Sequence, residues 1–155
     1  MIKLLQILFF SSFMLLNGCS SIVNGSTEAM SIVAIPATAT ITLKTGKGVT
    51  VTQQTGSLSY DLKRSTDWFD GAEYKLEVTS KGYEKQTIII EPTVSGWYIG
   101  GNLFSGGLLG WLVIDPATGG MWILQPNNGQ EIDNLRVTLA ANIPTDTLAK
   151  ATQIQ

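Results

Sequence analysis

An apolar run near the N-terminus, ending at the only cysteine, constrains this 155-residue chain more than any other feature, because it separates a leader from the part that can fold. Lys3 precedes the run, which extends from Leu4 to Leu16 and is interrupted by Gln6 and the Ser11-Ser12 pair. A basic start, a short apolar stretch and small residues after it are typical of a secretory leader. A transmembrane helix is the alternative, but the run is shorter than the roughly 20 residues that cross a bilayer core.

The four residues Leu16-Asn17-Gly18-Cys19 directly follow the apolar run. They resemble the lipobox of bacterial lipoproteins. The resemblance implies that the Cys19 sulfur receives a diacylglycerol and that the chain is cut between Gly18 and Cys19, so that residues 1–18 are a signal peptide. Residue 20 is Ser and not Asp. In Gram-negative members of that class this implies a lipid-anchored protein in the periplasmic leaflet of the outer membrane.

Composition limits what the remaining residues can do. The chain has 10 basic and 12 acidic residues and a net charge of −2, without a block of either sign, so nucleic acid is not an expected partner. There is one cysteine, so no disulfide can form within the chain, and there is no histidine. The length after the leader suits one domain with its own core.

Short β-branched runs bounded by glycine or proline predict strands over residues 30–35, 38–45, 49–53, 57–62, 74–80, 84–91 and 135–140. Leu58, Tyr60 and Leu62 alternate with polar residues, and so do Tyr74, Leu76 and Val78, which is typical of strands with one buried face. We therefore expect a mainly β protein, a small antiparallel β-sandwich over residues 29–140. Residues 19–28 are expected to be a lipidated flexible tether, and residues 141–155 a C-terminal tail.

Two resemblances accompany this pattern. Residues 36–41 with the turn at 46–48, the hairpin residues 74–78 and Lys81-Gly82-Tyr83 resemble the PEGA domain, a small β-sandwich of exported bacterial proteins, over residues 30–91. The chain departs from that pattern at residues 55–57, where PEGA domains have Thr-Pro before the fourth strand. Residues 20–27 and 101–122 are similar to a group of small uncharacterised bacterial and phage-borne lipoproteins. That likeness implies a place in the envelope and no reaction.

A glycine-rich insert, residues 95–124, lies before the last predicted strand, and residues 96–114 carry no charge. Helical spacing of its glycines predicts a smooth face that another backbone can approach. Each interior glycine costs a helix about 1 kcal/mol relative to alanine, so this segment needs a covering surface. It either plugs the sandwich or makes a second contact with the membrane or with copies of itself. The candidate contact residues are Trp97, Gly100, Phe104, Gly106, Gly110 and Trp111.

Catalytic patterns are absent from the sequence. Nucleophilic catalysis needs a hydroxyl or thiol beside a base, and the chain has neither a histidine nor a Ser-x-x-Lys motif. The acidic residues between 61 and 73 lack the spacing of a calcium loop, and Gly46-Lys47-Gly48 predicts a hairpin turn and not a phosphate loop. We expect no enzyme, no cofactor and no metal site.

A polar bend holds the best candidate for an exposed ligand contact, the run Asp67, Trp68, Phe69 and Asp70. Aromatic rings beside carboxylates can stack on sugars or anchor a protein partner. The first hypothesis is a non-enzymatic, lipid-anchored envelope protein with a structural, assembly or interaction role, through an envelope protein partner or self-association. The alternatives are a module that binds cell-wall glycan such as peptidoglycan, or a small ligand, and a membrane-perturbing protein of phage origin.

Overall fold

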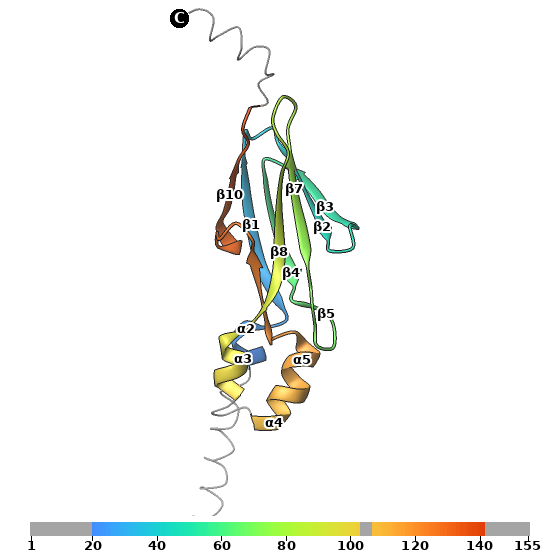
Figure 1. The fold of residues 1–155 in the computed structure, drawn as a ribbon, viewed down its shortest axis with the longest axis vertical. Helices are drawn as coiled ribbons and strands as arrows, with labels where there is room; N and C mark the ends of the chain where they lie inside the picture. Colours follow the sequence, from blue (N-terminus) through green and yellow to red (C-terminus); the bar gives the residue numbers. More distant parts are fainter. Residues whose placement is uncertain (1–19, 103–106, 142–155) are drawn as a thin grey trace, which may run out of the picture.

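The computed structural model describes residues 20–102 and 107–141. Two β-sheets packed on a common core form the body of the protein (Figure 1). The three-stranded sheet has the order β10-β1-β4 and consists of β1 (Thr27–Ile35), β4 (Ser57–Lys63) and β10 (Leu135–Thr138). The five-stranded sheet has the order β3-β2-β7-β8-β9 and consists of β2 (Thr40–Thr45), β3 (Thr50–Thr55), β7 (Tyr74–Thr79), β8 (Gln86–Val94) and β9 (Trp122–Pro126). The predicted mainly β fold is confirmed.

Alternating side chains of both sheets fill the core. Ile32 of β1 and Leu62 of β4 are fully buried and share one cluster with Leu43, Leu76 and Ile90 of the larger sheet. The period of two seen in the sequence therefore does place one face of each strand inside. It holds for Tyr74, Leu76 and Val78, all buried. Tyr60 is the exception, because it is exposed although Leu58 and Leu62 on either side of it are buried.

The last strand differs from the antiparallel arrangement that the sequence predicts. β10 pairs with β1 in parallel, with Ile32 opposite Leu135 and Ile35 opposite Thr138. The remaining pairs in the two large sheets are antiparallel. β10 can run parallel to β1 because β9 leads away from the helical end and the 3-10 turn Ile132–Asn134 places the start of β10 partway along β1, from where β10 continues away from that end (Figure 1).

The predicted insert 95–124 is divided between helices and a strand. α3 (Gly96–Gly101), α4 (Gly107–Leu109), a π-helical turn (Gly110–Ile114) and α5 (Asp115–Thr118) form its helical part. Its last residues belong to β9. This strand pairs with β8 from Val94 opposite Trp122 to Ile90 opposite Pro126. The sequence does not predict this strand separately, because its apolar residues directly continue the glycine-rich run.

The helices gather at one end of the sandwich and do not plug its interior (Figure 1). α2 (Ser20–Asn24) lies there with α3 and α5 and contacts both. No helix in the described ranges combines the length and the apolar character that crossing a bilayer requires.

Residues 20–28 are ordered, whereas the sequence predicts a flexible tether for them. Ser20–Asn24 form α2, Gly25 adopts a positive φ of 68°, and β1 begins at Thr27. The physical reason is that the polar side chains of this segment bind groups about 95 residues away in the chain, described below. Of the predicted tail, Ala141 makes a bridge to Tyr83, and residues 142–155 lie outside the described residues.

Small turns and a hairpin complete the described chain. Gly46 and Gly48 form the predicted turn between β2 and β3, where Gly48 has a positive φ of 84°. The predicted polar bend folds as a short hairpin of β5 (Ser65–Asp67) and β6 (Asp70–Gly71). A 3-10 turn (Ile132–Asn134) precedes β10.

Glu77 on β7 forms ion pairs with Lys44 and Lys85. Its Oε2 accepts hydrogen bonds from the ammonium groups of Lys44 and Lys85, whose Nζ atoms lie 2.8 Å and 3.0 Å away. These contacts lower the pKa of Glu77 from 4.5 to about 2. A carboxyl whose pKa falls on folding stabilises the fold above its unfolded pKa and loses that contribution as the pH falls through the folded value. We expect Glu77→Gln to have a lower melting temperature than the unaltered protein at pH 7, and the difference to shrink as the pH falls from 4.5 to 2. Thermal unfolding across that range measures it. An equal difference at pH 7 and pH 2 would show that the ion pairs do not act through this pKa.

Candidate functional site

A buried carboxylate joins the first described residues to the helical end. Asp115 is fully buried at the start of α5. Its Oδ2 accepts from the backbone N–H of Ser20 at 3.1 Å, and its Oδ1 accepts from the N–H of Ser21 at 2.7 Å. The Ser21 hydroxyl and the Asn102 amide also donate to it. Helix-starting N–H groups have no partner inside their own helix, so the Asp115 carboxylate supplies the acceptors that α2 lacks. We call Asp115, Ser20, Ser21 and Asn102 the Asp115 cluster.

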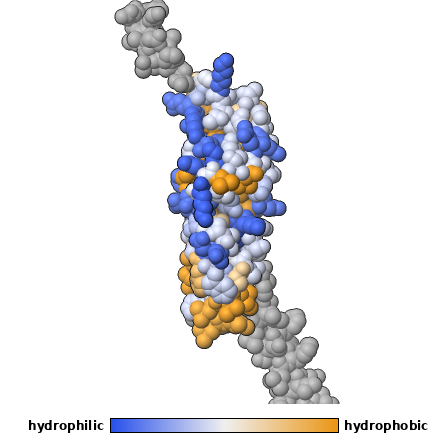
Figure 2. All heavy atoms as spheres, turned by 90° about the vertical axis from the view of Figure 1, so that its right-hand side faces the viewer, coloured by the Kyte–Doolittle hydropathy of each residue, from blue (hydrophilic) through white to orange (hydrophobic). Residues whose placement is uncertain are grey.

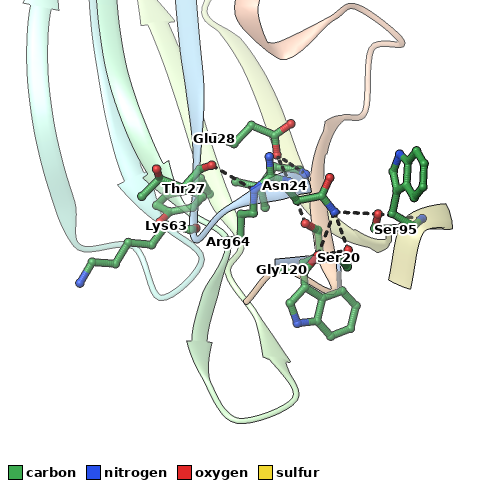
Figure 3. A network of polar contacts seen from close by, with 12 residues as sticks. Ser20, Asn24, Thr27, Glu28, Lys63, Arg64, Ser95 and Gly120 are labelled. Carbon is green, nitrogen blue, oxygen red and sulfur yellow. Dashed lines mark hydrogen bonds and ion pairs between the residues drawn. The ribbon is translucent and has the colours of Figure 1, made fainter. Parts of the chain in front are cut away.

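Asn24 fixes the other end of α2. Its side-chain amide lies 2.8 Å from the Ser95 hydroxyl, 2.9 Å from the Gly120 carbonyl oxygen and 2.8 Å from the Ser20 hydroxyl (Figure 3). Ser20 in turn donates its hydroxyl to the Gly120 carbonyl. Ser95 also accepts from the Trp97 N–H and so caps α3. One amide therefore connects α2, the start of α3 and the turn before β9.

An ion pair continues this polar network into the sandwich (Figure 3). The Arg64 guanidinium lies 3.0 Å from the Glu28 carboxylate and donates to the carbonyl oxygens of Thr27 at 3.0 Å and Trp122 at 2.8 Å. The same Glu28 oxygen accepts from the Leu124 N–H at 2.7 Å. Burial lowers the pKa of Arg64 below its usual value and the Glu28 charge raises it, while the guanidinium stays protonated at any pH the protein meets. The pair therefore connects β1, the residue that follows β4, and β9 next to α2.

Gly120 allows α2 to approach the domain closely. A Cβ built on Gly120 would lie 2.5 Å from the Ser21 Cα and 2.7 Å from its backbone nitrogen, both closer than real Cβ contacts. We expect Gly120→Ala to displace α2 and lower the free energy of unfolding by about 1–3 kcal/mol. Denaturant unfolding measures this.

A second glycine gives the matched control for that substitution. A Cβ on Gly100 in α3 meets nothing within 4 Å, so Gly100→Ala is expected to raise the stability by about 0.5–1 kcal/mol through helix propensity. Equal stability of the Gly120→Ala and Gly100→Ala proteins would contradict the close packing of α2.

The outer face of the helical end is apolar. Figure 2 shows the hydrophobic colour gathered at this end, while the sandwich above it is mostly polar. Seven large apolar side chains of α3, α4 and the π-helical turn are exposed, and we call them the apolar end: Trp97, Ile99, Leu108, Leu109, Leu112, Val113 and Ile114. The surface of a soluble monomer rarely gathers this many large apolar side chains in one place.

The predicted insert residues have different positions. Trp97 is 55% exposed, so the interpretation that it fills the core of the domain is wrong. Trp111 is half-buried against Tyr98, with ring centroids 6.4 Å apart, and its carbonyl accepts from the Tyr98 hydroxyl at 3.0 Å. Burial, and then the neighbouring Asp115 charge, raise the pKa of Tyr98, which keeps that hydroxyl a donor. Phe104 and Gly106 lie outside the described residues.

The glycines of the insert do not form the predicted close-packed face among the described residues. A Cβ at Gly96 or Gly100 would meet open space, so no described backbone approaches them. Gly110 is buried at the start of the π-helical turn. The pairing of Gly106 with Gly110 falls outside the described residues.

The predicted ligand contact lies on the β5–β6 hairpin. Trp68 is 51% exposed and Phe69 is 44% exposed, with ring centroids 6.1 Å apart. Asp67 accepts from the Trp68 N–H at 2.7 Å, and Asp70 accepts from the Thr66 hydroxyl, so both carboxylates stabilise the turn. The hairpin lies at the helical end (Figure 1), where Gly119 packs against Ser65. The structure therefore brings the predicted insert residues and the predicted ligand contact to the same end.

Sequence reasoning missed most of the polar network. No local pattern links Asp115 to the donors that it binds, the backbone amides of Ser20 and Ser21. Arg64 carried no signal beyond being a basic residue in a polar bend. In the described parts of the chain, no group of three or more cysteine and carboxylate side chains could hold a metal ion.

Comparison with known proteins adds no relative. No protein-family model matches the chain, and neither do curated proteins or solved structures. The lipobox and PEGA resemblances stay predictions.

Proposed function

We propose that this chain is a non-enzymatic, lipid-anchored envelope protein, held by acyl chains on Cys19 in the periplasmic leaflet of the outer membrane. The leader pattern and the lipobox resemblance support the anchor. Two or more acyl chains suffice for stable attachment, whereas one gives only marginal binding. The role that fits such a protein is structural, as a membrane-proximal component of an envelope assembly.

One observation carries the proposal beyond the leader pattern. Ser20, one peptide bond after Cys19, is fully buried and hydrogen-bonded to Asp115 and Gly120. An anchor on Cys19 would therefore be attached to the folded domain directly, without a flexible linker. A nine-residue strand such as β8 spans about 30 Å, so the domain would carry its β7–β8 turn about that far from the membrane.

Fatty-acid labelling and intact mass test the anchor. We expect the mature protein to begin at Cys19 and to carry the mass of its acyl chains. Because Cys19 is the only cysteine, Cys19→Ser should lose all incorporated fatty acid and keep residues 1–18. Ser59→Ala, an exposed change on β4, is the control and should be labelled normally. An unmodified thiol, or a cut at another position, would exclude the proposal.

A second candidate function is glycan binding at the β5–β6 hairpin. The hairpin that carries the two exposed aromatic rings also contributes Thr66 and Asp70 to the lining of a groove of about 570 Å³, together with Lys47 and Glu73. Exposed rings next to polar groups suit a sugar ligand. Peptidoglycan pull-down tests this: Trp68→Ala should reduce retention, while Trp97→Ala, which removes another half-exposed tryptophan, should not. Equal retention of both variants and the unaltered protein would remove this candidate.

A further inference from the structure

We propose that the apolar end rests in the lipid interface of the membrane that carries the anchor, so that the domain stands on the bilayer through two contacts. This inference depends on the proposed function for its anchor. It adds a specific surface and orientation. The occupant is lipid, and a second copy of the chain is the competing outcome in the test below.

The apolar end is a continuous group of large apolar side chains. Leu109 is 65% exposed and Trp97 is 55% exposed, and the other members of the apolar end lie on the same short helices. In the view of Figure 2 the hydrophobic colour covers this tip of the molecule. Burial of such side chains in an interface is favourable in proportion to the apolar area removed from water.

The segment that carries the apolar end has no charged residue in its sequence. Residues 96–114 contain no ionisable acid or base other than Tyr98, and its hydroxyl donates to the Trp111 carbonyl oxygen. The one carboxylate that follows, Asp115, is turned inward and hydrogen-bonded on both oxygens. A charge moved out of water is costly unless it is paired, so a segment that enters lipid must satisfy its charges internally. The apolar end meets this condition among its described residues.

The point at which residues 1–19 join the domain indicates that the occupant is lipid. Ser20 is fixed at the helical end by the Asp115 cluster, so residues 1–19 join the domain there (Figure 1). If Cys19 is acylated, its lipid starts at this end. If the leader is retained, the apolar run Leu4–Leu16 starts from the same end. Either hydrophobic group therefore brings the apolar end to a bilayer.

The geometry favours a shallow contact. No described helix is long enough to span a bilayer, whereas amphipathic elements lie in the interface plane with the apolar face about 5–10 Å deep. An exposed tryptophan such as Trp97 is typical of that depth, because its ring is apolar and its N–H is polar. The β5–β6 hairpin lies beside α5, where Gly119 packs against Ser65 (Figure 1).

Site-specific fluorescence on the lipidated full chain tests the contact. With Cys19 acylated, a newly introduced cysteine is the only free thiol and can carry an environment-sensitive dye. Leu109→Cys probes the apolar end, and Val49→Cys in the β2–β3 turn is the matched control, because the two side chains are 65% and 64% exposed. Ile99→Cys on α3 is a second probe. The proteins are reconstituted in vesicles of phosphatidylethanolamine and phosphatidylglycerol.

We expect the dyes at positions 109 and 99 to shift to the blue and to be quenched by lipids that carry a nitroxide near the headgroup. The dye at position 49 should keep the emission wavelength of a water-exposed dye and should not be quenched by these lipids. If the dyes at all three positions showed the emission wavelength of a water-exposed dye, the inference would be overturned. Shielding at 109 and 99 without lipid quenching, together with crosslinked dimers, would assign the surface to a second copy instead. Near-ultraviolet circular dichroism checks that each variant is folded.

The same samples separate failure of this inference from failure of the proposed function. Intact mass reports the acyl chains on Cys19 independently of the dyes. If the protein is acylated but the dyes at positions 109 and 99 emit as they do in water, the lipid anchor is supported and the contact between the apolar end and lipid is excluded. A free Cys19 thiol would exclude the proposed lipid anchor, and the dye would then also label Cys19.

Discussion

Asp115→Ala is expected to lower the free energy of unfolding by about 3–5 kcal/mol and to detach α2 from the domain. Hydrogen bonds to a charged group are worth about 1.5–3 kcal/mol each, and removing the acceptor leaves buried donors without partners. The Asp115 carboxylate accepts from Ser20, Ser21 and Asn102. Their losses overlap, so the expected total is less than their sum.

Denaturant unfolding and limited proteolysis measure these two effects. The control is Asp133→Ala in the exposed 3-10 turn, which is expected to change the stability by less than about 0.5 kcal/mol. The Asp115 variant should be cut by protease near residues 20–25 while the control resists. A stable Asp115→Ala protein with an intact N-terminal segment would show that α2 is held by something other than this carboxylate.

Arg64→Ala is expected to lower the free energy of unfolding by about 3–5 kcal/mol, because it leaves the partly buried Glu28 carboxylate without its counter-ion. It also removes the donors to the carbonyl oxygens of Thr27 and Trp122. The matched control is Arg136→Ala on β10, an exposed arginine, with an expected change below about 0.5 kcal/mol.

A double substitution separates the worth of the pair from the penalty of an unpaired charge. Replacing both partners, as in Glu28→Gln with Arg64→Met, should be milder than Arg64→Met alone, because no buried charge is left unpaired. Denaturant unfolding of the four proteins gives the coupling free energy. If the double variant lost as much as the sum of the two single variants, the Arg64–Glu28 contact would contribute nothing.

The strands were predictable because burial on one face imposes a period of two on the sequence. Leu76 and Val78 of β7 show this directly, and their strand was placed to within one residue. β9 was missed because Trp122-Ile123-Leu124 follows the glycine-rich run without a change in composition. The parallel pairing of β10 with β1 could not be derived either, because the pairing direction depends on where the preceding connection leaves the chain.

The ordering of residues 20–28 was hidden for a different reason. Short polar residues around a glycine, as in this segment, are typical of a flexible connector, and nothing local contradicts that prediction. The partners that fix Ser20 and Asn24 are Asp115 and the Gly120 carbonyl, about 95 residues away. Contacts of such long range arise only once the sandwich has brought α5 and the turn before β9 to the start of β1. Single-sequence patterns report local preferences and therefore cannot reveal them.

Hydrogen exchange at the amides of Ser20 and Ser21 in the mature protein tests most directly whether the domain follows the lipid anchor on Cys19 without a flexible linker. Both N–H groups donate to the Asp115 carboxylate, so we predict protection comparable to that of amides in the middle of β1. Exchange at the rate of an unstructured peptide would mean that a flexible segment separates Cys19 from the domain, and would contradict the account.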